Sequence, residues 1–285
     1  MKVTIGIPVF NGAEFLEAAL DAACTQEWPE LEILVADNAS TDRSVEIAEA
    51  RCRADERVRL IRAEENRGAA WNFNRLVEQA KGEFFWWLPH DDVLEPRAVE
   101  LCVQRLLANP EAVSCHPRTT YIDRTGWPIG LHSRPLQITS PSPAARLGRF
   151  LIEHSRCDGV LGLHRLAALR RTGLIRGFRG GDEILYAELA IAGVVLEEPE
   201  PLYGRRLHEG SSLQARTDEE ANAWFDPAST VTFKDVGRFL ATQFHRMVDE
   251  QGLTWTQARL CHLQVERWRA VRWMRLRKRQ LRGTA

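Results

Sequence analysis

The sequence predicts an α/β fold, with a mainly parallel sheet flanked by helices and a helical extension at the C-terminal end. Two observations predict it. In residues 1–110, short apolar runs that suit buried strands alternate with segments whose apolar residues recur at helical spacing, which is typical of right-handed βαβ units. The 285 residues are 44% hydrophobic and 27% charged, as in one large globular domain or two closely packed ones.

The first half is expected to contain four strands and four helices in alternation. The strands are expected at 2–9, 31–36, 58–61 and 83–88, and the helices at 13–23, 43–54, 69–80 and 97–108. Asp42 is expected to cap the second helix, and Pro96 suits the first turn of the fourth, where a backbone N–H has no acceptor. Continuous apolar strands of this kind lie buried between two layers of helices.

The second half is less regular. Strands are expected at 112–116, 119–123, 159–163, 194–196 and 202–207, helices at 145–154, 165–172 and 182–192, and a Pro- and Ser-rich loop at 131–144. Residues from 218 onward are expected to be wholly helical. These changes of pattern divide the chain into residues 1–110 and 111–217, which form two halves of one domain, and the extension 218–285.

Polar side chains follow the predicted strands at the point where each strand ends. Asn11, Asp37, Asn66 and the pair Asp91-Asp92 occupy these positions. In open α/β sheets, ligands bind in the crevice outside the carboxyl ends of the strands. The sequence therefore predicts that these side chains converge on one edge of the sheet and bind a ligand there.

The pair Asp91-Asp92 has two interpretations. Adjacent carboxylates repel each other, and a divalent cation shared with phosphate oxygens would compensate that repulsion. A solvated turn in which Asp92 caps the next helix explains the pair as well.

The turns after the second and third strands are also open to two interpretations. Asp37 either binds the base or ribose of a nucleotide or belongs to a turn capped by Ser40 or Asp42. Asn66 and Arg67 precede a helix N-terminus, which favours anions, but a plain loop before a helix explains them too.

Four motifs carry a resemblance to a known family. The runs IPVFNG, LEILVADNASTD, ENRGAAWNFNRL and GEFFWWLPHDDVLEP occur in this order, and together they resemble inverting family 2 glycosyltransferases of the GT-A fold. The match is dense over the first 110 residues and thinner to about Ser212. It implies a Rossmann-like domain whose residues 1–110 bind a nucleotide-diphosphate-sugar donor and whose residues 111–217 bind the acceptor.

The resemblance also implies site residues. The nucleoside pocket would be lined by Pro8, Phe10, Asn11 and Asp37, and the ribose or diphosphate would lie near Asn66, Arg67 and Asn72. Asp91 and Asp92 occupy the acidic metal motif for Mn²⁺ or Mg²⁺, with Asp92 as the direct ligand. Many relatives have a further Asp where this chain has Pro89, which puts a contact to the donor sugar in doubt. The intervening His90 is expected to be packed or solvated.

Two later segments complete the implied site. The run GDEILYAELAIAG is similar to the segment that carries the family's general base, which maps to Asp182, with Glu183 as its competitor and a helix cap as an alternative role. The run YGRRLHEGSS resembles the closing strand and loop. There Arg205 or Arg206 would neutralise the diphosphate and His208 would complete the metal shell, unless they form an ordinary basic surface cluster.

The resemblance implies metal-assisted transfer with inversion to the hydroxyl of a sugar, lipid-linked or small-molecule acceptor, in cell-surface polysaccharide, glycolipid or natural-product glycosylation. A sugar-phosphate nucleotidyltransferase is an alternative enzyme. It needs a basic glycine-rich loop after the first strand, where this chain has Asn11-Gly12-Ala13-Glu14. A nucleic-acid or scaffold protein built around the basic C-terminal helix is a non-enzymatic alternative.

The charge distribution bears on that last alternative. The formal net charge is −1, but residues 259–285 carry nine basic side chains and one acidic one, a net +8, so residues 1–258 carry −9. An acidic body argues against nucleic acid as the substrate. The segment 259–282 is expected either to be a solvated helix that packs its Trp stripe on the core or to contact an anionic membrane surface.

The location is predicted from what the sequence lacks. The first twelve residues are too short and interrupted for a secretory signal, and no window approaches the roughly 20 apolar residues of a membrane-spanning helix. Six cysteines without C-x-x-C pairs suit reduced thiols. We expect a cytoplasmic protein with peripheral contact at the inner face of the membrane.

Overall fold

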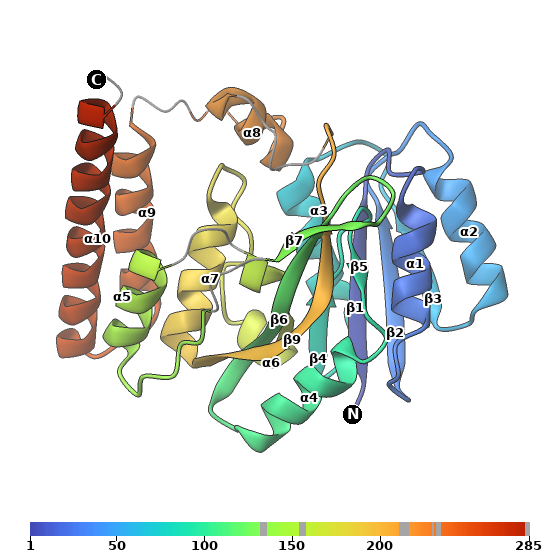
Figure 1. Ribbon diagram of the computed structural model, residues 1–285, viewed down its shortest axis with the longest axis horizontal. Coiled ribbons are helices and arrows are strands. Elements are labelled where there is room, and N and C mark those ends of the chain that lie inside the picture. Colours follow the sequence, from blue (N-terminus) through green and yellow to red (C-terminus); the bar gives the residue numbers. More distant parts are fainter. Residues whose placement is uncertain (132–135, 154–157, 211–216, 230, 232–234, 283–285) are drawn as a thin grey trace.

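A computed structural model describes residues 1–285 except 132–135, 154–157, 211–216, 230, 232–234 and 283–285. The strands of the described residues form one sheet in the order β3-β2-β1-β4-β8-β6-β9-β5, with β7 paired to β6 (Figure 1). Their bounds are β1 Val3–Val9, β2 Leu31–Asp37, β3 Val58–Arg62, β4 Phe84–Trp87, β5 Val93–Leu94, β6 Ala112–Ile122, β7 Pro128–Leu131, β8 Leu163–Arg165 and β9 Val194–Arg206.

Helices cover both faces of this sheet, and the C-terminal helices form a further layer at one side. Their bounds are α1 Leu16–Cys24, α2 Ser44–Ala54, α3 Ala69–Gln79, α4 Ala98–Ala108, α5 Pro143–Glu153, α6 Leu166–Leu169, α7 Gly181–Ala192, α8 Asp218–Phe225, α9 Val236–Glu250 and α10 Trp255–Arg282, with a 3₁₀ helix at Asp158–Leu161. The α/β class and the covered sheet that the sequence predicts are confirmed.

The direction of the strands determines where a site can form. β1, β2, β3 and β4 are parallel, β8 runs antiparallel between β4 and β6, and β9 is parallel to β6. Six of the nine described strands therefore end at the same edge, which lies at the top of Figure 1. We call it the carboxyl edge.

Two apolar cores fill the two faces. Successive strand residues point to opposite sides, so Trp86 packs with Ile5 and Ile7 against α1 and α4, whereas Trp87 packs with Leu34 on the face of α3 and α7. Fully apolar strands such as β4 are buried because both of their faces are covered.

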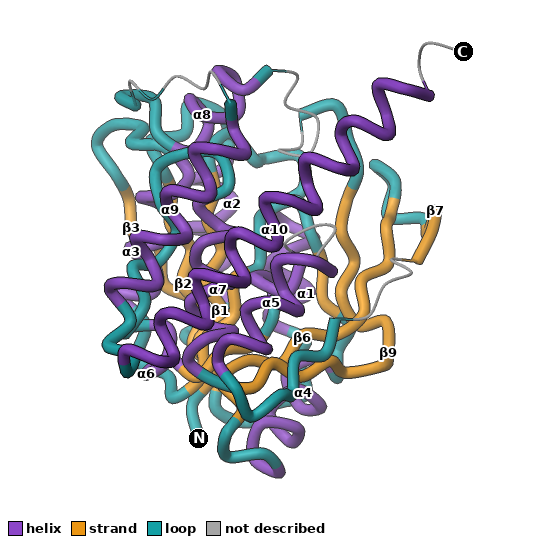
Figure 2. Tube along the Cα trace, turned by 90° about the vertical axis from the view of Figure 1, so that its left-hand side faces the viewer, coloured by secondary structure: helices purple, strands orange, loops and turns teal. Residues whose placement is uncertain are grey.

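The C-terminal helices form an outer layer on the second face. α10 lies beside α5 and α9 (Figure 2), and it buries Cys261, Val265 and Trp268. The Trp268 ring meets Phe244 of α9 edge-to-face, with 5.3 Å between ring centroids. None of the described helices is long and apolar enough to span a membrane.

Several element boundaries differ from the expected ones. The expected strand at 159–163 is the 3₁₀ helix Asp158–Leu161 followed by the short β8. The strand pairs expected in 112–123 and 194–207 are single strands, β6 and β9, whose mutual register shifts between Pro117 and Thr119. Proline cannot donate to the ladder, so a bulge forms there without ending the strand. The described residues 226–229 and 251–254 lie between helices, so the extension is not wholly helical.

Candidate functional site

Asn11 lies in the turn after β1, and Asp37 is the last residue of the neighbouring β2. Asn11 has a left-handed backbone with φ of 49°, and its Oδ1 accepts a 2.8 Å hydrogen bond from Thr41 N. Asp37 is 1% exposed, and both of its carboxylate oxygens lie 3.3 Å from Ser40 N. Pro8 is buried in β1, whereas Phe10 is 41% exposed at the edge. The two turns thus brace each other beside an exposed aromatic ring.

Asn66 and Arg67 reach the surface before α3. Asn66 Oδ1 accepts hydrogen bonds from Asn38 Nδ2 at 2.8 Å and from Gly68 N at 2.9 Å, which fixes the turn against β2. The guanidinium of Arg67 lies 4.5 Å from the centre of the Trp71 ring. This exposed cation at a helix N-terminus is well placed for an anionic ligand.

Asn72 lies beneath the edge instead of on it. Its side chain is 3% exposed, donates to Ala36 O at 2.8 Å and accepts from Arg75 Nε at 2.9 Å. Arg75 also donates to Asp37 O at 2.6 Å. In this structure Asn72 joins α3 to the end of β2, and its amide is fully used by the chain.

Asp92 is fastened to β9. The Tyr203 hydroxyl donates to its Oδ2 at 2.5 Å, and the Arg206 backbone N–H donates to its Oδ1 at 2.9 Å. The side chain is buried, and burial followed by the neighbouring charge of Asp91 raises the pKa of Asp92 to about 7. Both carboxylate oxygens of Asp92 therefore serve to hold the turn after β4 against β9.

Asp91 keeps part of its carboxylate exposed. Its Oδ2 lies 3.0 Å from His208 Nε2, and the two side chains are 18% and 13% exposed. Burial, the largest single influence, raises the pKa of Asp91, but the hydrogen bond with His208, the charges of His90 and His208 and a backbone hydrogen bond together lower it below its usual value. The hydrogen bond between the two side chains raises the pKa of His208. Among the described residues, no three His, Cys, Asp or Glu side chains are grouped as a ready metal cage.

The two arginines of β9 have different surroundings. Arg206 is buried, donates to Asp91 O at 2.8 Å and to Asp123 O at 3.0 Å, and lies over the Phe15 ring at 4.9 Å. Arg205 forms an ion pair with Asp158. Both guanidinium groups stand close to the Asp91 turn because β9 ends there.

Asp182 lies in the first turn of α7 together with Glu183, and both are partly exposed. The helix cap is Gly180, so Asp182 is not the cap residue. Figure 1 shows α7 running down from the carboxyl edge and leading into β9, so its first turn faces the same edge as the strand ends.

Sequence reasoning also left some of these contacts unseen. Tyr203 and Asp158 touch site residues far away in the sequence, Asp92 and Arg205, whereas Trp71 lies under Arg67, one helical turn before it. His90 packs in the space left by Gly12, with its Nδ1 3.3 Å from Pro8 O, as a packed histidine would.

Comparisons with known sequences agree with this geometry. The family model described as glycosyl transferase family 2 matches residues 4–177. Chondroitin synthase of Pasteurella multocida is 36% identical over 105 residues, which are 37% of this chain and 11% of that protein. Chondroitin synthase of Escherichia coli is 30% identical over 135 residues, which are 45% of this chain and 20% of that protein. The matched regions thus span only about a tenth to a fifth of these relatives.

Solved structures give the fold. Staphylococcus aureus TarS 1–349 in complex with UDP-GlcNAc has a TM-score of 0.63 at 14% identity and covers 92% of this chain and 70% of its own. Mannosyltransferase PcManGT from Pyrobaculum calidifontis, in complex with GDP-Man and Mn²⁺, has a TM-score of 0.54 at 16% identity and covers 95% and 73%. Together with the family match, these neighbours favour a glycosyltransferase over the nucleotidyltransferase and the nucleic-acid or scaffold protein. The chain belongs to glycosyl transferase family 2 and has the GT-A fold.

Proposed function

We propose that this glycosyltransferase moves a sugar from a nucleotide-diphosphate-sugar to an acceptor hydroxyl with inversion at the anomeric carbon. The observation that carries the proposal is the convergence of three features on the carboxyl edge: the β1 and β2 turns, the Asp91–His208 pair and the first turn of α7. The structural neighbours with UDP-GlcNAc and GDP-Man support a donor of this class.

The donor would lie across the β1, β2 and α3 ends. Pro8, Phe10, Asn11 and Asp37 would surround its nucleoside, and the exposed Arg67 beside Asn66 would meet its phosphates. Asn72 would act from below by holding β2 in place.

A divalent cation, Mn²⁺ or Mg²⁺, fits the residues beside the diphosphate. Carboxylate and imidazole groups suit Mn²⁺, and such ions complete their shell with phosphate oxygens and water. Asp92 has both oxygens engaged by Tyr203 and Arg206, so we place direct ligation on Asp91 and His208 and give Asp92 the role of holding their turn. The bound ion would neutralise charge on the leaving diphosphate.

The remaining charges suit the other half of the reaction. Asp182 would take the proton of the acceptor hydroxyl, with Glu183 in the same turn as the alternative base. Arg205 and Arg206 would add positive charge beside the departing diphosphate. The acceptor would be a sugar, a lipid-linked sugar or a small molecule of cell-surface polysaccharide, glycolipid or natural-product synthesis.

We also propose a location. The protein would work in the cytoplasm, at the inner face of the membrane, with residues 259–282 against anionic lipid. Exposed apolar and basic side chains on α10 support this contact.

A thermal-shift screen of nucleotide-sugars with Mn²⁺ tests the proposal. One donor class is expected to raise the melting temperature of the wild type, and Asp91→Ala is expected to lose that shift while keeping its own fold. Glu56→Ala, in the exposed turn before β3, is the matched control and should behave as the wild type. If no nucleotide-sugar shifts the melting temperature, or if Asp91→Ala keeps the full shift, the donor and metal assignment is wrong.

A further inference from the structure

The loop between α6 and α7 leads directly to the proposed base, and it is held in a strained shape. Residues 170–180 form this loop, which we call the α6–α7 loop. Leu174 has a φ of 55°, and Gly180, which caps α7, has a φ of 86°. A leucine in the left-handed region is strained, so the surroundings must impose this conformation.

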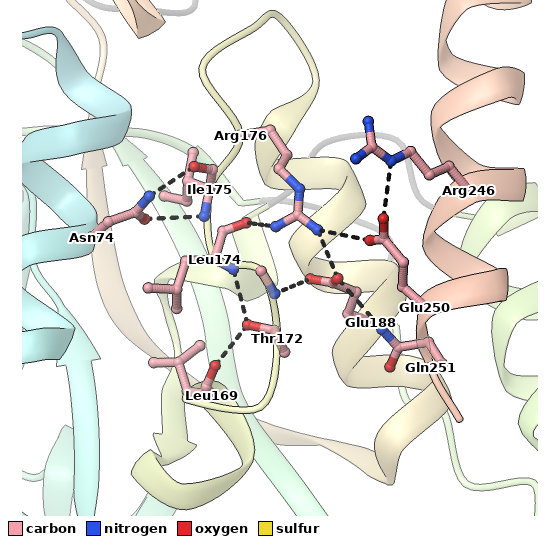
Figure 3. A network of polar contacts seen from close by, with 11 residues as sticks. Asn74, Leu169, Thr172, Leu174, Ile175, Arg176, Glu188, Arg246, Glu250 and Gln251 are labelled. Atoms are coloured by element: carbon pink, nitrogen blue, oxygen red, sulfur yellow. Dashed lines mark hydrogen bonds and ion pairs between the residues drawn. The ribbon is translucent and has the colours of Figure 1, made fainter. Parts of the chain in front are cut away.

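The first restraint comes from the donor-binding half. Asn74 of α3 donates from Nδ2 to Ile175 O at 2.8 Å and accepts at Oδ1 from Ile175 N at 3.0 Å (Figure 3). One side chain therefore satisfies both backbone groups of a single residue, 101 positions further along the chain. The next residue after the strained Leu174 is thus fixed to α3 in position and orientation.

The second restraint is a buried ion pair beneath the loop. Arg176 Nη2 lies 2.9 Å from Glu188 Oε1, and its Nη1 donates to Leu174 O at 3.1 Å (Figure 3). Glu188 Oε2 accepts from Gly173 N at 3.0 Å, and the Glu188 side chain is 2% exposed. Removing Arg176 would leave the buried carboxylate of Glu188 without its counter-charge, which is strongly destabilising.

These restraints reach the first turn of α7. A Cβ atom on Gly181 would lie 2.1 Å from Arg176 O, so the first residue of α7 packs directly on the Arg176 backbone. Asp182 is the following residue. Any displacement of Arg176 is therefore transmitted to the start of the helix that carries Asp182.

The same helix α3 begins at the donor end of the site. Its N-terminus follows Asn66 and Arg67, and Asn74 lies further along it. α3 thus contacts the expected position of the donor diphosphate at one end and the α6–α7 loop further along.

We propose that Asn74, together with the Arg176–Glu188 pair, positions Asp182 relative to the donor half of the site. The inference rests on the proposed role of Asp182 as general base. Asn74 touches neither donor nor acceptor and is a positioning residue. A misplacement of about 1 Å at a reacting group can lower a rate about a hundredfold, so a small shift of α7 is enough to matter.

The variants Asn74→Ala and Asn74→Asp test this positioning role. We expect Asn74→Ala to lower kcat for transfer by about tenfold or more, while the Kd for the nucleoside diphosphate stays within about twofold. Asn74→Asp keeps the acceptor for Ile175 N but places an oxygen against Ile175 O where Nδ2 donated, so its kcat should also fall, and it serves if Asn74→Ala folds poorly. Asn109→Ala is the matched control, because its amide donates to Arg105 O at 2.9 Å on the distant α4.

A double-mutant cycle with Asp182→Asn separates positioning from a general loss of structure. If Asn74 acts through Asp182, Asn74→Ala should change the residual single-turnover rate of Asp182→Asn by less than about twofold, because coupled residues are not additive. Additive losses of transfer rate in the double variant, or a normal kcat for Asn74→Ala, would overturn the inference. If Asp182→Asn is inactive at the same time, the proposed role of Asp182 as base still stands. Near-normal transfer by Asp182→Asn alone would overturn both.

Discussion

Gly12 shows how one residue without a side chain joins two turns of the site. A Cβ atom on Gly12 would lie 2.2 Å from His90 Cδ2, so the ring of His90 occupies the space that any other residue would need. The Gly12 backbone N–H donates to Ser44 Oγ at 2.9 Å, which ties the same turn to α2. Through His90, the turn after β1 therefore touches the turn that presents Asp91.

Substitution of Gly12 should be felt at that turn. Gly12→Ala is expected to displace His90 and to lower the free energy of unfolding by about 1–3 kcal/mol, as overpacking of a close contact does. Equilibrium unfolding in denaturant measures it. The double variant Gly12→Ala/His90→Ala should recover much of the loss, and Gly130→Ala, with nothing within 4 Å, is the matched control. An unchanged stability of Gly12→Ala would show that His90 moves aside freely.

The sequence predicts where the site residues lie, but not which of their side chains are held by the rest of the chain. The strand-end rule placed Asn11, Asp37 and Asp91 on one edge, and the structure brings them there. It could not show that Asp92 turns inward while Asp91 stays partly exposed, because the partner that decides this, Tyr203, lies 111 positions away. The family resemblance implies that Asn72 lies near the ribose or diphosphate, and the local pattern could not show that its amide donates to Ala36 O of β2.

Among the elements, β3 begins at a local ion pair whose effect depends on pH. Asp55 ends α2, and hydrogen bonds from the Arg57 guanidinium, opposed by partial burial, lower its pKa to about 2. A carboxylate whose pKa is lower in the folded than in the unfolded chain stabilises the fold at pH values above its pKa in the unfolded chain. That stabilisation is lost as the pH falls through the folded pKa.

Asp55→Asn should therefore be destabilised in a pH-dependent way. We expect a deficit of about 1 kcal/mol at pH 6, after allowing for solvent screening of a partly exposed pair. The deficit should shrink as the pH falls from about 4 towards about 2, where wild-type Asp55 is itself protonated. Thermal unfolding across this range measures it, with Glu56→Gln as the control. If the loss of stability stays constant with pH, it comes from lost hydrogen bonds and not from the charge of Asp55.

The elements of the first half could be predicted well and those of the second half less well, for a physical reason. β1, β2 and β4 are buried throughout and mostly apolar because both faces are covered, so their pattern is strong. β7 is exposed throughout although its sequence PIGL contains Ile129 and Leu131, so its apolar residues do not report burial. Asp158–Leu161 forms a 3₁₀ turn because tertiary contacts, such as the Arg205 ion pair, decide its conformation.

On the scale of the whole molecule, the two sides of the basic helix α10 differ in character. The inward side of α10 packs on the core through Cys261, Val265 and Trp268. Its outward side presents large apolar side chains, namely Trp255, Leu260, Leu263, Trp273 and Met274. The acid of this helix, Glu266, is already paired with Arg269 and His245. An exposed apolar stripe among arginines is typical of a helix that lies on an anionic lipid surface.

Flotation with lipid vesicles tests this contact without removing the packed helix. The wild type should float with vesicles containing phosphatidylglycerol and not with neutral phosphatidylcholine vesicles, and salt should weaken the binding because each basic side chain near the surface contributes about 1 kcal/mol. Leu263→Ser/Trp273→Ser changes two outward side chains that are 57% and 55% exposed, so the fold should be kept and the flotation lost. Trp127→Ser, at a 72% exposed tryptophan in the turn before β7, is the matched control and should float as the wild type does. Equal flotation of all three proteins would mean that this face of α10 is an ordinary solvated surface.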